Sequence, residues 1–137
     1  MTMQELAHRL VRPDYAIMAS CLVRMKVSVI DELWVRDEYI RHGKFRDDAT
    51  GNRCHTFLNQ ERKKKFPFVY SPILFYEQGS VRFEDGNHRF VVLRDAGVAS
   101  VDVATTATMR MALNDKSLLE AMLWQVWDKQ TEIPQKR

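Results

Sequence analysis

The sequence predicts an α/β fold in which a small mixed β-sheet is surrounded by helices. Two observations predict it: short segments that alternate apolar and polar residues, as half-buried strands do, and longer segments whose apolar residues recur at helical spacing. The chain has 137 residues, of which 45% are hydrophobic and 28% are charged. This length and composition suit one soluble domain with its own core. We therefore expect a single domain over residues 1–137, with 130–137 as a flexible tail.

Four segments are expected to form the sheet. In the first, apolar residues alternate with Arg24, Lys26 and Ser28, and the other three are apolar segments bounded by turn residues. Their ranges are 21–29, 72–76, 80–84 and 100–104.

Helices are expected at 1–11, 31–41, 55–65 and 88–96, and a last helix is expected to begin near Ser117. Residues that cap or break helices bound these ranges, such as Ser28 before the second and Pro67 after the third. Ser117 and Glu120 form a capping-box pattern, and the apolar residues that follow recur at helical spacing. Residues 44–53 are expected to form a long polar loop, which is either a lid or binding loop or simply a disordered segment.

The most informative motif is Asp85-Gly86-Asn87-His88-Arg89, between the third strand and the fourth helix. Asp-Gly favours a tight turn, and Asn87 is a good N-cap for the helix. His88 and Arg89 then place two potentially cationic side chains in the first helical turn, where cations oppose the helix dipole. A segment that breaks one local rule while obeying the others is a candidate functional site.

An anion suits this arrangement, because backbone N–H groups, an imidazole and a guanidinium meet at a helix N-terminus. We predict that Gly86, Asn87, His88 and Arg89 bind a phosphate, with Arg89 projecting from the surface. Asp85 and His88 are the candidate catalytic residues. Asp85 is also the candidate ligand of Mg²⁺, which most phosphoryl transfer requires. The alternative is a plain turn and helix cap, with both cationic side chains in solvent or paired with acidic neighbours.

Residues 71–105 resemble the ParB/sulfiredoxin superfamily. The pattern is an apolar strand, a short hairpin at Glu77-Gln78-Gly79, a second strand, the Gly-Asn-His-Arg turn and its helix, Gly97, and a short strand. The turn is most similar to the Asp-Gly-His-His-Arg version of ParB-like free serine kinases. Sulfiredoxins have a catalytic cysteine where this chain has Asn87, and partition proteins have a box richer in arginine. The resemblance implies a ParB/sulfiredoxin-like fold with a nucleotide as ligand. It does not fix the activity, because members include kinases, ATPases, nucleases and DNA-binding proteins.

A second candidate site is the basic group Arg62, Lys63, Lys64 and Lys65. Cations at a helix C-terminus are favourable in any case, so a solvated helix end explains them. The alternative is contact with the phosphate backbone of a nucleic acid, with neighbouring aromatic rings for stacking. The formal net charge of +3 permits a polyanionic partner without requiring one.

The spacing of the cysteines and the hydropathy of the chain indicate the cellular compartment that we expect for the protein. Cys21 and Cys54 lack the spacing of paired metal ligands, so free thiols in a reducing bacterial cytoplasm are expected. No apolar segment approaches the roughly 20 residues of a membrane span, and no secretion signal is apparent. We expect no membrane partner.

Three functions follow from the sequence. The first is a nucleotide-binding enzyme that performs phosphoryl transfer or nucleoside-triphosphate hydrolysis at the turn from Asp85 to Arg89. The second is a DNA-binding protein or nuclease that uses the same turn together with the basic group. The third is an inhibitor or interaction protein that keeps the fold without catalysis, and its origin on a mobile element is what the resemblance to the ParB/sulfiredoxin superfamily suggests.

Overall fold

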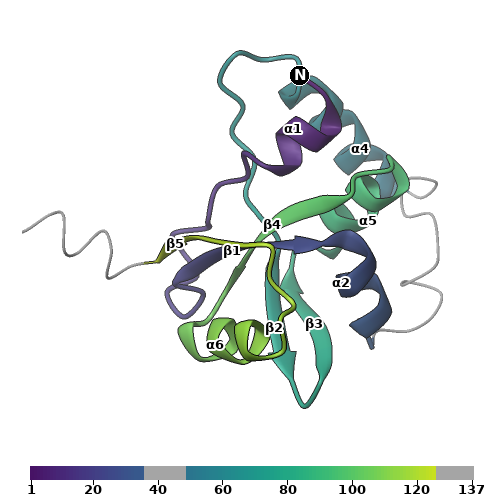
Figure 1. Cartoon of the computed structure of the whole chain (residues 1–137). Coiled ribbons are helices and arrows are strands. Elements are labelled where there is room, and N and C mark those ends of the chain that lie inside the picture. The colour runs from purple at the N-terminus through teal and green to yellow at the C-terminus, as the bar shows by residue number, and fades with distance from the viewer. Residues whose placement is uncertain (36–48, 126–137) are drawn as a thin grey trace, which may run out of the picture.

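The computed structural model describes residues 1–35 and 49–125, and its architecture is an α/β fold with a five-stranded mixed sheet (Figure 1). The strands are β1 (Cys21–Lys26), β2 (Ile73–Glu77), β3 (Ser80–Asp85), β4 (Ser100–Thr105) and β5 (Ala121–Gln125). Their order across the sheet is β3-β2-β4-β1-β5. The predicted fold class is confirmed. The four predicted strands are present, and β5 is a further strand that the sequence analysis missed.

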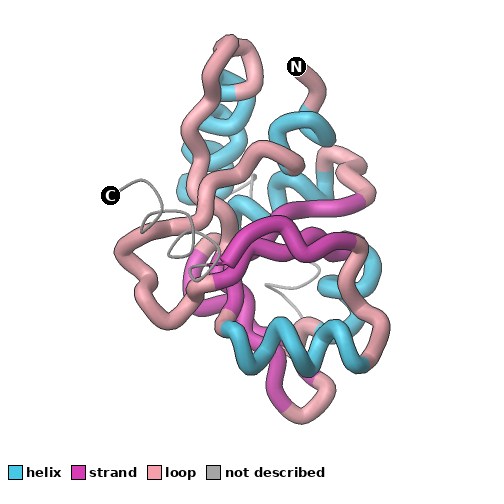
Figure 2. The backbone as a smooth tube through the Cα atoms, turned by 60° about the vertical axis from the view of Figure 1, so that its left-hand side comes forward, coloured by secondary structure: helices cyan, strands magenta, loops and turns pink. Residues whose placement is uncertain are grey.

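Strand pairing is antiparallel except between β2 and β4, which run parallel. Figure 2 shows the strands crossing the middle of the molecule. The hairpin from β2 to β3 turns at Gln78 and Gly79, whose φ angles are 54° and 77°. Positive φ at both central residues is the mark of a type I′ turn, whose twist matches that of the paired strands. The expected hairpin is therefore confirmed.

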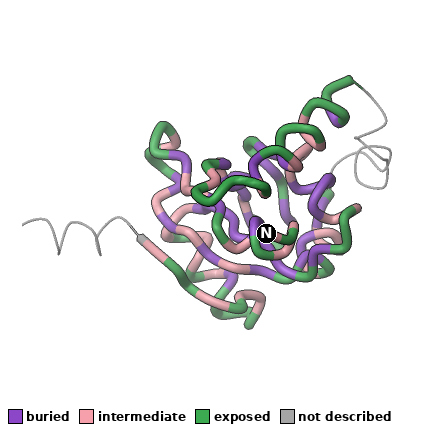
Figure 3. Tube along the Cα trace, turned by 90° about the horizontal axis from the view of Figure 1, so that it is seen from above, coloured by how far each residue is buried: buried purple, intermediate pink, exposed green. Residues whose placement is uncertain are grey.

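The described residues include five helices, which all contribute to one hydrophobic core. They are α1 (Met3–Ala7), α2 (Val27–Leu33), α4 (Ala49–Glu61), α5 (Asn87–Asp95) and α6 (Ala107–Asp115). Each places a fully buried side chain in this core, in the same order Leu6, Ile30, Leu58, Phe90 and Leu113. Figure 3 shows the buried residues gathered in the middle of the molecule. No helix within the described residues is long and apolar enough to cross a membrane.

The face of the sheet that points away from this core carries a smaller apolar cluster and an ion pair. Ile73 and Ala104 lie level with each other on β2 and β4 and pack with Ala19, from the loop before β1. Arg24 and Asp102 lie opposite each other on β1 and β4. The Arg24 guanidinium donates two hydrogen bonds to the buried Asp102 carboxylate, at 2.7 and 3.3 Å. A bidentate ion pair therefore joins the two central strands.

Element boundaries in the first part of the chain differ from the prediction. The first helix is shorter than 1–11, because α1 spans Met3–Ala7 after a capping box made by Thr2 and Glu5. The strand predicted over 21–29 ends at Lys26, and α2 begins at Val27 instead of residue 31. The physical reason is that Lys26 pairs with Ser100, the first residue of β4, so the ladder between these strands ends there. The part of the predicted helix from 36 to 41 lies outside the described residues.

The predicted loop over 44–53 is wrong where it is described. Residues 49–53 form the first turns of α4, and 44–48 lie outside the described residues. This helix also ends earlier than predicted, at Glu61. The basic residues from Arg62 to Lys65 therefore follow the helix and do not form its last turn.

The helix predicted from Ser117 is also wrong. Ser117 lies just after the end of α6, in the left-handed conformation with φ of 58°. Its N–H bonds to the Asn114 carbonyl and the Leu118 N–H bonds to the Leu113 carbonyl, which is the Schellman pattern of a helix end. The next element is strand β5, paired with β1. The predicted tail at 130–137 lies outside the described residues.

Candidate functional site

Gly86 connects β3 to α5 and is the N-cap of that helix, with φ of 86°. The N-cap predicted from the sequence, Asn87, is instead the first residue of α5, and its side chain accepts a hydrogen bond from the His88 N–H at 2.8 Å. A Cβ atom at Gly86 would lie 2.7 Å from Pro72 Cα and 2.9 Å from Arg89 Nη2. Glycine is required here both by the positive φ and by this close approach.

Asp85 holds the turn through both carboxylate oxygens. Oδ1 accepts a hydrogen bond from the Gly86 N–H at 2.8 Å, and Oδ2 accepts one from the Tyr15 hydroxyl at 2.9 Å. Oδ2 also lies 3.6 Å from Arg89 Nη2. The pKa of Tyr15 is raised by partial burial, then by the hydrogen bond to Asp85 and the charge of that carboxylate. These contacts give Asp85 a structural role in the turn.

Arg89 is more enclosed than the sequence analysis expected. Its side chain is 23% exposed and lies back along the Gly86 turn, so the expectation that it projects from the surface is wrong. Nε and Nη2 are buried, and neither has a hydrogen-bond partner among the described residues. A buried donor without a partner costs about 1–3 kcal/mol. An anion beside this guanidinium would remove that cost.

A cavity of about 340 Å³ lies beside the turn, between α4 and the start of α5. The structure brings all five residues of the predicted motif to its wall: Asp85, Gly86, Asn87, His88 and Arg89. The opposite wall comes from α4 and consists of Thr50, Arg53, Cys54 and Phe57. We call this cavity the Arg89 pocket.

Sequence reasoning missed the α4 wall of the Arg89 pocket. Arg53 adds a second guanidinium, whose Nη2 donates a hydrogen bond to Thr50 Oγ1 at 3.2 Å. Among the residues that the structure describes, the pocket is lined by two arginines and one aspartate, Asp85, so this part of its wall carries net positive charge. The available signal was one of the two interpretations of 44–53, that of a loop which lines a binding site. Its residues 50 and 53 do so, although from a helix.

The pKa of the Cys54 thiol, on α4, is influenced by Arg89 on the opposite wall of the pocket. Burial raises the pKa of its thiol to about 11, and the positive charge of Arg89 partly offsets that rise. The thiol is therefore protonated at neutral pH and forms a neutral part of the wall. Because the thiolate is the nucleophile, Cys54 is poorly suited to covalent chemistry near pH 7.

The described residues fit a magnesium site poorly. They contain no group of three or more His, Cys, Asp and Glu side chains that could hold a metal ion. Proteins usually bind Mg²⁺ through one or two carboxylates together with substrate phosphates and water. Asp85 is the single carboxylate among the described residues of the pocket wall, and its oxygens already accept hydrogen bonds from Gly86 and Tyr15. The role of Asp85 as a Mg²⁺ ligand stays a prediction.

The structure does not bring the basic group to the Arg89 pocket. Arg53 lies near the start of α4 and Arg62 follows its end, so at about 1.5 Å per residue they are more than ~10 Å apart along the helix. Arg62 Nε donates to Asn59 Oδ1 at 2.8 Å, and Lys64 pairs with the buried Glu61 carboxylate. Contact of this group with nucleic acid stays a prediction.

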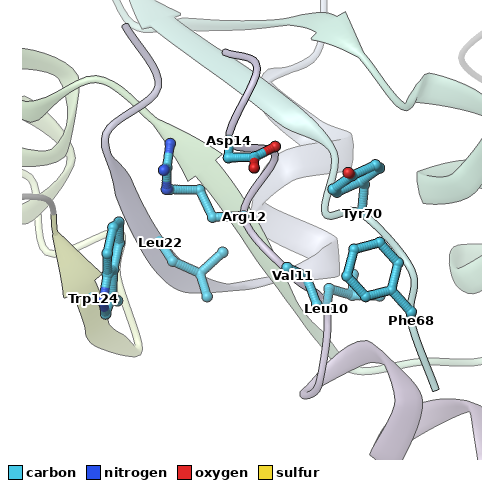
Figure 4. A pocket seen from close by; sticks show the side chains of 8 residues that line it. All are labelled: Leu10, Val11, Arg12, Asp14, Leu22, Phe68, Tyr70 and Trp124. Carbon is cyan, nitrogen blue, oxygen red and sulfur yellow. The ribbon is translucent and has the colours of Figure 1, made fainter. Parts of the chain in front are cut away.

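A larger cavity of about 570 Å³ lies elsewhere on the molecule (Figure 4). Trp124 forms one side, Phe68 and Tyr70 form the other, and Leu10, Val11 and Leu22 lie between them. The Arg12 guanidinium lies 4.8 Å from the centroid of the Trp124 ring. This lining is mainly apolar, which does not suit a phosphate.

The fold and the pocket together define an α/β protein with a basic pocket at a helix N-terminus. No known protein family matches the chain, and no curated protein matches its sequence. Its fold is similar to the crystal structure of Oncogenic Suppression Activity Protein, a plasmid fertility inhibition factor, with a TM-score of 0.62 at 15% sequence identity. The alignment covers 89% of this chain and 69% of that one. The similarity shows a shared fold, and the resemblance to the ParB/sulfiredoxin superfamily stays a prediction.

Proposed function

We propose that the Arg89 pocket binds the phosphate groups of a nucleotide. The observation that carries this proposal is Arg89 itself, whose buried Nε and Nη2 have no hydrogen-bond partner among the described residues. A guanidinium binds phosphate oxygens well, through paired and charge-assisted hydrogen bonds. The start of α5 supports the same ligand, because first-turn N–H groups have no acceptor within the helix and can bind an anion, although the His88 N–H already donates to Asn87 Oδ1.

The α4 wall supports a ligand larger than a single phosphate. Arg53 and Phe57 line the Arg89 pocket and also a second hollow along α4, with Asn52, Thr56 and Gln60. A nucleotide with its phosphates at Arg89 has room to extend along this helix. Phe57 is 43% exposed, so its ring is accessible to the rest of the ligand.

We further propose that the protein transfers or hydrolyses a phosphoryl group of the bound nucleotide. His88 lines the pocket and is the candidate proton-transfer group. Asp85 is the candidate that orients a nucleophile, although its contacts with Gly86 and Tyr15 favour a structural role. Phosphate binding therefore comes first in the proposal and turnover second.

A nucleic acid is the alternative ligand of the same turn. The basic residues that would extend its contact surface lie at the other end of α4, and two of them, Arg62 and Lys64, already have partners within the protein. This separation favours a free nucleotide over a DNA-binding or nuclease function.

Calorimetric titration of the full chain with ATP, CTP and inorganic phosphate, with and without Mg²⁺, tests the proposal. We expect Arg89→Ala to weaken nucleotide binding at least tenfold, and Arg89→Lys to restore part of the loss because it keeps the charge. Arg82→Ala is the matched control, since Arg82 is an exposed arginine whose nearest acidic contact is 3.7 Å away. Equal affinity in the parent and Arg89→Ala, with both folded by circular dichroism, would reject the proposal.

We further propose an interaction function in which the protein inhibits the transfer of a mobile element. The fold similarity to a plasmid fertility inhibition factor is the observation that favours it. The test is conjugation frequency from donor cells that express this chain. We expect fewer transconjugants than with an empty vector. Comparison with Arg89→Ala then shows whether inhibition depends on the Arg89 pocket, and unchanged transfer with the parent chain would reject this second proposal.

A further inference from the structure

The loop that follows α4 combines exposed lysines with exposed aromatic rings. Its residues 62–68 read Arg-Lys-Lys-Lys-Phe-Pro-Phe. Lys63, Lys64 and Lys65 are exposed, Phe66 is 81% exposed and Phe68 is 56% exposed. In Figures 1 and 2 this chain segment is the uppermost loop of the molecule, before it descends toward β2. The loop therefore places two exposed aromatic rings, Phe66 and Phe68, next to three exposed lysines.

A buried carboxylate holds the loop in this shape. Glu61 is 4% exposed, and its Oε1 accepts a hydrogen bond from the Phe68 N–H at 2.9 Å. Its other oxygen pairs with Lys64. The Phe68 ring packs edge-to-face on Tyr70, with 5.1 Å between the ring centroids. Contacts therefore hold both ends of the segment from Lys64 to Phe68, which reduces the cost of ordering its backbone when Phe66 binds a partner.

The charge on the loop is only partly neutralised. Glu61 pairs with Lys64, whereas Lys63 and Lys65 have no acidic partner among the described residues. Lys65 Nζ lies 5.4 Å from the centroid of the Phe66 ring. One positive charge thus lies directly beside the most exposed ring, which suits a partner that is negative at its surface and apolar just beneath it.

We infer that residues 62–68 dock on the surface of an anionic lipid bilayer, with Phe66 at the boundary between headgroups and acyl chains and Lys63 and Lys65 among the headgroups. Anionic lipids attract basic residues near a bilayer, and the transfer of an aromatic ring from water to the membrane interface is favourable. The attachment is peripheral and needs no membrane-spanning helix, and it departs from the expectation, drawn from hydropathy alone, that the protein has no membrane partner. It does not depend on a ligand in the Arg89 pocket.

A nucleic acid is the other polyanion to consider, and the loop suits it less well. Proteins that bind single strands use a basic groove in which several aromatic rings stack on successive bases. Here the loop projects from the molecule. Phe68 is already packed on Tyr70, which leaves Phe66 as the one ring of the loop without a ring partner among the described residues.

Co-sedimentation of the full chain with vesicles tests the inference. The vesicles are pure phosphatidylcholine or a mixture with 30% phosphatidylglycerol. We expect binding to the anionic vesicles and little to the neutral ones. Each lysine near an anionic surface accounts for about a fivefold change in binding, so Lys63→Gln with Lys65→Gln should weaken it roughly 25-fold. Phe66→Ser should weaken binding about tenfold through the lost apolar contact.

Two matched variants control for charge and exposed apolar area elsewhere. Lys26→Gln with Lys116→Gln removes the same charge from exposed positions outside the loop, and Met18→Ser removes another highly exposed apolar side chain. Both should bind like the parent. Absence of binding by the parent chain, or equal loss in loop and control variants, would overturn the inference. It is also overturned if Phe66→Ser binds vesicles normally while the lysine variant loses affinity for a 20-nucleotide DNA, because that result identifies a nucleic-acid surface.

Discussion

The Tyr15 hydroxyl donates a 2.9 Å hydrogen bond to Oδ2 of Asp85, across 70 positions of sequence. This contact joins the loop before β1 to the turn that begins α5. The Tyr15 ring also packs edge-to-face on Tyr70, with 5.5 Å between the centroids. The acidic residue of the Arg89 pocket is therefore held in place by a segment from the N-terminal part of the chain.

Asp85→Asn tests whether that carboxylate is structural. Asparagine also favours the turn, so we expect an intact fold and nucleotide affinity equal to or a few-fold above that of the parent, because a negative charge leaves the pocket. The raised pKa of Tyr15 should fall toward its ordinary value, but only in part, since partial burial is the first cause of the shift. Ultraviolet titration of the tyrosines, with Tyr15→Phe as reference, measures this change. Loss of Mg²⁺-dependent turnover with unchanged binding would instead assign Asp85 a catalytic role.

Gly86→Ala and Gly79→Ala form a matched pair. Both glycines have positive φ, so each substitution should cost about 1–2 kcal/mol of backbone strain. A Cβ at Gly79 meets nothing within 4 Å, whereas at Gly86 it meets Pro72 and Arg89. Overpacking should cost Gly86→Ala about 1–3 kcal/mol more and should displace the guanidinium, which weakens phosphate binding. Urea unfolding and calorimetry measure both effects, and equal stability of the two variants would contradict the close approach.

Alkylation of Cys54 should report on the charge in the Arg89 pocket. Because its pKa is raised to about 11, the rate of reaction with iodoacetamide should keep rising from pH 8 to about 11. Arg89→Ala should move that profile to higher pH, since Arg89 lowers the pKa of Cys54. Peptide mass spectrometry separates Cys54 from the buried Cys21. A midpoint near pH 8.5 would show that the thiol is not enclosed.

The same pKa has a consequence for stability. The folded state holds the Cys54 proton more tightly than the unfolded chain, so this stabilisation is complete below about pH 9. It is lost as pH rises toward 11. Cys54→Ala should therefore flatten the fall in unfolding free energy between these values, relative to the parent chain, in urea titrations at each pH.

Salt dependence separates a free nucleotide from a nucleic acid. Each phosphate contact with a nucleic acid contributes about −0.7 to −0.9 to the slope of log affinity against log salt concentration. We expect a shallow slope for ATP that is unchanged in Lys63→Gln with Lys64→Gln, because the basic group lies at the far end of α4 from Arg53. A steep slope for DNA that falls by about one to two units in this variant would favour the nucleic-acid alternative.

The central part of the fold was predictable because its signals are local. The hairpin from β2 to β3, the helix after Gly86 and its end at Gly97 each follow from residues close in sequence. Gly97 has φ of 82° and ends α5 as predicted. The end of α6 uses the same backbone pattern with Ser117 in place of glycine, so the sequence lacked the expected signal and suggested a helix start. Strand β5 could not be predicted from its own residues, because its pairing with the distant strand β1 decides its conformation.

Of the two walls of the Arg89 pocket, only the one formed by residues 85–89 was predictable from the sequence. The motif from Asp85 to Arg89 lies together at a helix start, as expected, because its residues are adjacent in sequence. Arg53 and Cys54 reach the pocket through the packing of α4 against α5, which no short segment encodes. The burial of Arg89 was missed for the same reason. Its environment depends on Pro72 and α4, which lie outside the motif.

The strand order sets the sequence in which the sheet can assemble during synthesis. β1 is made early, yet Cys21 pairs with Thr105 on one edge and Gln125 on the other. The hairpin from β2 to β3 can close as soon as it leaves the ribosome, whereas β1 waits with both edges open until β4 and β5 have been translated. Contacts between such distant segments form slowly, and unpaired strand edges promote aggregation. A chain stopped before Ala121 would therefore keep β1 as an edge strand, with its unpaired backbone groups open to other nascent chains.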